Sequence, residues 1–170
     1  LDMLEESVGL YPNPLAYRNL AVFWFSEDAY HKARDYMEKA LALAPEDAYN
    51  QVFAATFLAY EGKRKETLAI LESVPFDASM YYNFAVIYAE LGDDERALQY
   101  LRDHFYTYEY NDRVRAYEMQ EALTDYHFRN LYHDPRFQQL TARAHRPPGK
   151  ALPFWVDESV MPYRDAKESQ

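Results

Sequence analysis

Apolar residues recur at helical spacing along most of the first two thirds of the chain. The stretch from Ala16 to Asp47 carries two such stripes in succession, separated by a short polar break from Ser26 to Asp28. The first stripe consists of Tyr17, Leu20, Ala21 and Trp24, and the second of Ala33, Met37, Ala40 and Ala44. Pro45 then ends the pattern, because proline has no backbone N–H and clashes with the preceding turn. We predict a helical hairpin here.

The same pattern returns twice, at a period of about 30 residues, which is typical of stacked structural repeats. The second copy has Gln51, Ala54, Ala55 and Leu58, a turn at Gly62, and then Thr67, Leu71, Val74 and Pro75. The third has Tyr81, Phe84, Ala85 and Tyr88, a turn at Gly92, and then Ala97, Leu101 and His104. The second copy is the shorter, so its second helix should end early at "SVPFD". The third has no closing proline, so its second helix should continue into "FYTYEY".

The segments "AYRNLAVFW", "KARDYMEKALALAP" and "MYYNFAVIYAELGDDERALQYL" resemble the tetratricopeptide repeat family. Small residues stand where the two helices of a hairpin would approach most closely, namely Ala21, Ala55, Ala85, Ala33 and Ala97. The first copy departs from the pattern, with Asp28 where the turn glycine is usual. The resemblance implies an all-α fold, a right-handed α-solenoid of tetratricopeptide-like hairpins.

We divide the chain in the frame of these repeats. Residues 1–13 align with the second helix of a repeat whose first helix is missing, and the three repeats span 14–47, 48–77 and 78–111. Two explanations of the lone helix stay open: the chain is an excised part of a longer array, or this helix is a natural cap. Residues 112–145 lose the repeat phase and are expected to form capping helices.

A helix start is predicted within the capping region, where Asp134 can cap, Pro135 suits the first helical position, and Phe137 and Leu140 begin an apolar face. The segment "FRNLYHDPRFQQLTAR" is similar to segments that close bacterial tetratricopeptide arrays, and this resemblance implies a bacterial source. From residue 146 to 170 the chain becomes rich in proline, which favours extended backbone. Phe154, Trp155 and Val156 should nevertheless dock, either on the last helices, in a groove of the same or a neighbouring chain, or on a further domain.

Composition and charge narrow the function classes. The net charge of −10 disfavours nucleic acid as a partner, because phosphate backbones repel an acidic surface. The absence of cysteine excludes disulfides and thiolate chemistry but names no compartment, so cytoplasmic and periplasmic locations both stay open. No apolar run is long enough to span a bilayer, so membrane insertion is not expected.

Candidate chemistry is sparse. The five histidines do not cluster at metal-ligand spacing, and no phosphate-binding loop, nucleophile elbow or HExxH motif occurs. We therefore expect no enzyme activity, no metal and no cofactor.

In the resembled family, the first helix of each hairpin lines a concave groove that receives peptides. By phase, the groove residues are Arg18, Asn19, Val22 and Phe25 in the first hairpin, Tyr49, Val52, Phe53, Thr56 and Tyr60 in the second, and Tyr82, Asn83 and Val86 in the third. Only Arg18, Asn19 and Asn83 are of the types that clamp a carboxylate, so an extended or helical apolar peptide suits this surface better.

The predicted function is a non-catalytic scaffold that binds a peptide or protein partner. Two alternatives stay open: self-association through the N-terminal helix or the Trp155 segment, and a regulatory segment of a larger protein or enzyme.

Overall fold

The computed structural model describes residues 6, 8–27 and 29–142, and every regular element in these ranges is a helix. The chain divides into two compact units, residues 1–76 and 77–170. Each unit has its own packed helices and is described by itself.

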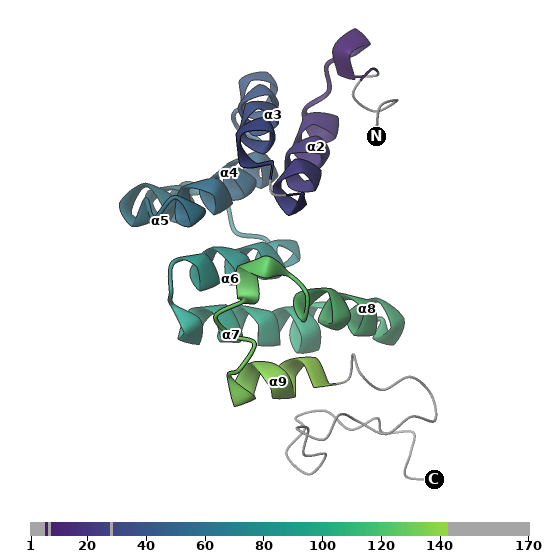
Figure 1. Cartoon of the computed structure of the whole chain (residues 1–170), viewed down its shortest axis with the longest axis vertical. Helices are drawn as coiled ribbons and strands as arrows, with labels where there is room; N and C mark the ends of the chain where they lie inside the picture. Colours follow the sequence, from purple (N-terminus) through teal and green to yellow (C-terminus); the bar gives the residue numbers. More distant parts are fainter. Residues whose placement is uncertain (1–5, 7, 28, 143–170) are drawn as a thin grey trace. The chain divides into compact units, whose positions relative to one another are not determined.

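Unit 1 consists of two helical hairpins (Figure 1). The first pairs α2 (Pro14–Ser26) with α3 (Tyr30–Leu43), and the second pairs α4 (Ala48–Tyr60) with α5 (Arg64–Ser73). Helix α3 also packs against α4, so the two hairpins are stacked. The second hairpin has the shorter second helix, and α5 ends before Val74 and Pro75, as the sequence predicts.

Polar caps at the helix starts explain where the first helices of unit 1 begin. The side chain of Asn13 accepts a hydrogen bond from the backbone N–H of Ala16, 3.1 Å away, and Pro14 occupies the first turn of α2. The side chain of Asp47 likewise accepts from the N–H of Asn50 at 2.8 Å. Such caps satisfy backbone donors that have no partner within the helix.

The hairpin turns repeat one backbone geometry. An N–H just after each first helix donates to the carbonyl five residues earlier: Ala29 to Trp24, Lys63 to Leu58 and Asp93 to Tyr88, at 2.9, 2.9 and 2.8 Å. Gly62 and Gly92 stand in the latter two turns with φ of 74° and 70°. This left-handed conformation closes a helix end and costs glycine least because it has no Cβ, which explains the turn signal in the sequence.

Small buried residues allow the helices of each hairpin to approach closely. Ala21 in α2 and Ala33 and Ala40 in α3 are fully buried and form one cluster with Met37, and Leu20 is also fully buried. The predicted core stripes are thus confirmed for this hairpin. Because there is no spare volume at such a contact, a larger side chain would force the helices apart.

The chain before α2 also packs on the first hairpin. Residues 8–10 are helical, and Val8 is buried. The hydroxyl of Tyr17 donates to the carbonyl of Val8 at 3.1 Å. This contact anchors the N-terminal helical turn to α2.

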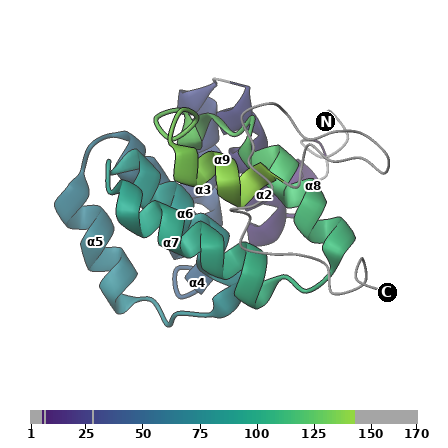
Figure 2. The same ribbon diagram turned by 90° about the horizontal axis from the view of Figure 1, so that it is seen from below.

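Unit 2 contains a third hairpin and, in its described part, further helical elements before and after it. The hairpin pairs α6 (Tyr81–Glu90) with α7 (Asp94–Asp103), which lie side by side in both views (Figures 1 and 2). The remaining elements are the 3-10 turn η1 (Ala78–Met80), the π-helical turn η2 (His104–Tyr108), α8 (Asp112–Ala122), the 3-10 turn η3 (Tyr126–Phe128) and α9 (Pro135–Thr141). Helix α9 packs against α7 and α8.

The helical backbone of this hairpin continues beyond α7 into "FYTYEY", as the missing proline predicts. Its last residues widen into the π-helical turn η2, which buries His104 and Phe105. Nε2 of His104 lies 2.9 Å from Oε2 of Glu118 in α8. The ring of His104 thereby links η2 to α8.

The predicted start of α9 is confirmed. The side chain of Asp134 accepts a hydrogen bond from the N–H of Arg136 at 2.8 Å, and Pro135 is the first helical residue. Phe137 and Leu140 are buried, and the ring of Phe137 packs on that of Phe128. The predictions for the Pro-rich segment, including Trp155, concern residues outside the described ranges.

Candidate functional site

Arg18 is the centre of a polar and aromatic cluster that joins α2 to α4. Its Nη1 donates to the side-chain oxygens of Asp47 and Asn50, at 3.1 and 3.0 Å. Its guanidinium carbon lies 5.3 Å from the ring centroid of Tyr49 and 5.7 Å from that of Phe53. Three predicted groove residues, Arg18, Tyr49 and Phe53, therefore meet at one place. The aromatic rings favour the positive charge, since their faces carry negative potential.

A second aromatic cluster is formed by residues of α2, α3 and α4. The ring of Phe25 packs edge-to-face on Tyr30, Phe57 and Tyr60, with centroid separations of 5.9, 5.1 and 5.2 Å. Phe25 and Tyr60 were both predicted as groove residues, and the structure brings them together. Tyr60 is 42% exposed, whereas Phe57 is buried. The solvent-exposed part of this cluster is therefore the side chain of Tyr60.

Glu61, just after α4, gathers three donors from the first two hairpins. It accepts hydrogen bonds from the hydroxyl of Tyr30 and from Arg34, and Nζ of Lys63 lies 2.5 Å away. The hydrogen bonds from Lys63 and Tyr30 lower the pKa of Glu61. Burial and the Glu61 carboxylate raise the pKa of Tyr30 to about 12. This network fixes the end of α4 against α3.

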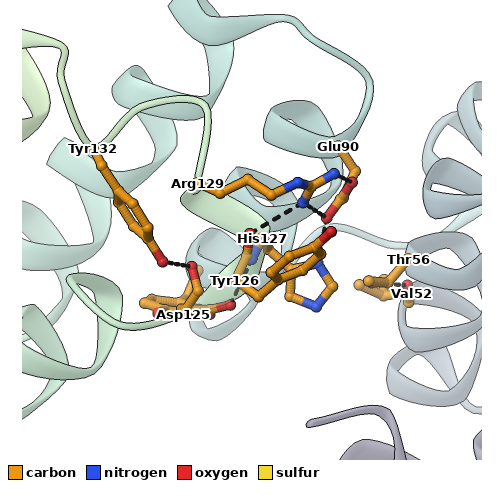
Figure 3. Close-up of polar contacts among 9 residues, drawn as sticks. Val52, Thr56, Glu90, Asp125, Tyr126, His127, Arg129 and Tyr132 are labelled. Carbon is orange, nitrogen blue, oxygen red and sulfur yellow. Dashed lines mark hydrogen bonds and ion pairs between the residues drawn. The ribbon is translucent and has the colours of Figure 1, made fainter. Parts of the chain in front are cut away.

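The remaining candidates of unit 1 differ in accessibility. Asn19 and Val22 are exposed on α2, with Val22 at 42%. Val52 and Thr56 on α4 are buried, and the hydroxyl of Thr56 donates to the carbonyl of Val52 at 3.3 Å (Figure 3). A surface on these helices is therefore made by Asn19, Val22, Tyr60 and the cluster around Arg18.

In unit 2, the predicted groove residues of α6 are in contact with a later part of the chain. The hydroxyl of Tyr82 donates to Oδ2 of Asp125 at 3.1 Å, and its ring packs edge-to-face on Phe128. Burial, together with the nearby Asp125 carboxylate, raises the pKa of Tyr82 well above its ordinary value. Asn83 is half-buried and Val86 is buried.

Glu90, at the end of α6, holds the same later segment. Its Oε1 lies 2.7 Å from Nδ1 of His127, and its two oxygens accept from Nη1 and Nη2 of Arg129 at 2.7 and 3.0 Å (Figure 3). The Glu90 side chain is only 2% exposed. Burial would raise the pKa of Glu90, but the hydrogen bonds from His127 and Arg129 outweigh it and lower that pKa.

Sequence reasoning missed the polar residues that organise both units, namely Asn50, Glu61 and Glu90. Asn50 stands one helical turn before Ala54 of the predicted core stripe, so the sequence places it on the buried side of its helix. A polar residue at a buried position needs hydrogen-bond partners, and this could have marked Asn50 as a structural residue. Glu90 stands one turn after Val86, but its partners His127 and Arg129 are far away in sequence. No local pattern could have found that pairing.

The described part of the chain contains neither a metal-binding cluster nor a membrane-spanning helix. In residues 6, 8–27 and 29–142, no group of three or more His, Cys, Asp or Glu side chains could hold a metal ion. Within the same part of the chain, no helix is both long and apolar enough to cross a bilayer.

Pairs of helices joined by a glycine turn, packed through alanines and stacked on one another, define a helical-repeat protein. The hairpin of unit 2 identifies the kind of repeat: residues 78–103 match the family model described as "Tetratricopeptide repeat". The chain thus contains a tetratricopeptide repeat, and the predicted resemblance is confirmed there. Comparison with curated proteins and with solved structures gave no match. Repeats of this type are typical of scaffolds for protein–protein interaction, and the presence of one here suggests such a role.

Proposed function

We propose that this protein is a non-catalytic scaffold that binds an extended peptide segment of a partner protein across α2 and α4. The observation that carries the proposal is the position of Arg18 between two side-chain acceptors and two aromatic rings. The guanidinium is held in one place, so its remaining donors are pre-organised toward a ligand. A rigid cation flanked by rings suits peptide recognition, because little side-chain entropy is lost on binding.

The chemistry of the surrounding residues favours a mostly apolar peptide. Val22 and Tyr60 supply apolar contact area, and the amide of Asn19 can pair with a peptide backbone that is otherwise unpaired. Asp47 already compensates the charge of Arg18. A carbonyl oxygen of the peptide therefore fits this position better than a free carboxylate.

The test is a selection of short peptides from a display library on the immobilised full chain, followed by fluorescence titration of the selected peptides. Val22→Ala and Phe53→Ala should each weaken binding by about ten-fold, which corresponds to about 1.4 kcal/mol. Leu43→Ala is the matched control, because Leu43 is also a large exposed apolar residue of unit 1 but lies on α3. The proposal fails if no peptide is enriched, or if all three variants bind equally well.

A second candidate function, self-association, is favoured by a separate apolar patch. Leu10, Tyr11 and Leu15 are 69%, 78% and 53% exposed and are close in sequence at the start of α2. Exposed apolar groups of this size often mark contact surfaces. Sedimentation of the full chain and of the Leu10→Asp/Leu15→Asp variant tests it: a dimer that dissociates in the variant supports this function, and a monomer in both removes it.

A further inference from the structure

The helix α6 of the tetratricopeptide repeat has two faces that meet different parts of unit 2. On one face the rings of Tyr81, Phe84 and Tyr88 surround Tyr100 of α7, with centroid separations of 6.0, 5.3 and 5.5 Å. This is the contact that builds the hairpin. The other face carries Tyr82 and Glu90, two helical turns apart.

That second face is covered by the segment Asp125–Arg129, which includes η3. At one end of the face, the hydroxyl of Tyr82 donates to Asp125, and its ring packs edge-to-face with that of Phe128 at a centroid separation of 5.6 Å. At the other end, the carboxylate of Glu90 pairs with His127 and with both terminal nitrogens of Arg129 (Figure 3). The segment thus presents an acid, an aromatic ring and two bases to matching groups on α6.

The segment itself has little secondary structure. It is a single 3-10 turn, closed by the N–H of Phe128 donating to the carbonyl of Asp125 and that of Arg129 donating to Tyr126, at 2.9 and 3.1 Å. The guanidinium of Arg129 also lies over the ring of Tyr126, 4.1 Å from its centroid. Besides the contacts with α6, the hydroxyl of Tyr132 donates to the carbonyl of Asp125 at 2.7 Å, and the ring of Phe128 packs on that of Phe137 in α9. The side chains of His127 and Arg129, in contrast, are paired with Glu90 of α6.

We propose that this face of α6 is a binding site for a segment of aromatic and basic character, and that Asp125–Arg129 is its built-in ligand. The site is separate from the α2–α4 surface, so the proposal goes beyond the proposed function and does not depend on it. The ligand chemistry follows from the contacts: a ring that packs on Tyr82 and a base that pairs with the carboxylate of Glu90. A segment of another protein with the same pattern binds here only by replacing residues 125–129.

Tethering explains why the site is closed in the intact chain. A ligand segment attached by a short linker has an effective concentration of about millimolar or higher at its site. A free peptide at micromolar concentration cannot compete with it. Weakening the tethered ligand, without changing α6, should therefore make the site accessible.

The experiment uses the full chain and a fluorescein-labelled peptide with the sequence of residues 124–132, TDYHFRNLY. In the chain, Arg129→Ala removes the two hydrogen bonds to Glu90 but leaves the α6 face intact. The peptide should bind this variant at least about ten-fold more tightly than it binds the parent chain, and the gain should disappear when Glu90→Gln is added. Arg113→Ala is the matched control, because Arg113 is an exposed arginine of α8 outside this contact.

Equal affinity for the parent, the Arg129→Ala chain and the control would overturn the proposal, and so would the absence of binding to all of them. A gain that survives Glu90→Gln would also overturn it, because the peptide would then bind elsewhere. Circular dichroism melting checks that each variant is folded. If Arg129→Ala does not fold, Arg129→Lys replaces it, since lysine keeps the charge but cannot pair with both carboxylate oxygens. The outcome is independent of whether the α2–α4 surface binds peptides.

Discussion

The side-chain oxygen of Asn50 accepts a hydrogen bond from Arg18, while its amide nitrogen donates to the carbonyls of Ala40 and Ala44 at 3.2 Å each. One fully buried amide thereby joins the last turn of α3 and a side chain of α2 to the start of α4. The carbonyls at the end of a helix have no partner within it, so Asn50 supplies what α3 lacks. It also fixes the guanidinium at the centre of the candidate site.

Asn50→Ala should destabilise the protein by about 2–3 kcal/mol, because buried carbonyls and the Arg18 guanidinium lose their partner. Chemical denaturation with urea measures this loss. The exposed Asn19 provides the control, and Asn19→Ala should change the free energy of unfolding by about 0.5 kcal/mol or less. A small effect at Asn50 would mean that water replaces its amide without cost.

Gly92→Ala should destabilise unit 2 by about 1–2 kcal/mol, since φ of 70° is unfavourable for a residue with a Cβ. An added Cβ meets no atom within 4 Å, so the effect is one of backbone conformation alone. Gly9→Ala is the comparison, because Gly9 has no positive φ and also has open space around it. Thermal melting of both variants should show a lower midpoint only for Gly92→Ala.

Ala97→Leu should cost about 1–3 kcal/mol, because Ala97 is fully buried in α7 beside α6 and a larger side chain pushes the two helices apart. The same substitution at Ala69, exposed on α5, should be nearly neutral. Urea denaturation of the two variants gives the comparison directly. Equal stability of the two variants would show that the space between α6 and α7 can accommodate a leucine at position 97.

The stability of unit 2 should fall in acid partly through Glu90. The pKa of Glu90 is lowered in the folded chain relative to 4.5, so its contribution is fully present above that value and is lost as the pH falls through the folded pKa. Between about pH 6 and about pH 3, the parent chain should therefore lose more free energy of unfolding than Glu90→Gln does. Parallel pH dependences in the two proteins would contradict the role assigned to the contact with His127 and Arg129.

Much of the hairpin architecture could be predicted because its causes are local. Ala21, Ala33 and Ala85 stand in phase with larger apolar residues, and that period specifies which side of a helix is buried. Gly62 and Gly92 mark turns that need a left-handed residue. The start of α9 was readable from Asp134 and Pro135 for the same reason, since a cap acts within one turn.

The candidate site was only partly predictable. The helical period tells which residues point away from the hairpin core, but it does not tell which other segments cover them. Val22 and Tyr82 have the same phase on their helices, yet Val22 is exposed and Tyr82 contacts Asp125 and Phe128. The difference depends on a segment distant in sequence. Such long-range contacts leave no periodic pattern.

The sequence by itself determined that this protein forms helical hairpins, where they turn and which alanines let them pack, since each of these follows from backbone preference and side-chain volume within a few turns. The tertiary structure decided which outward faces are accessible and where charges are paired. Arg18 reaches Asp47 and Asn50, and Glu90 reaches Arg129, only because packing brings separate helices together. Side-chain pairing across that distance depends on geometry in space, and the order of residues along the chain does not carry it.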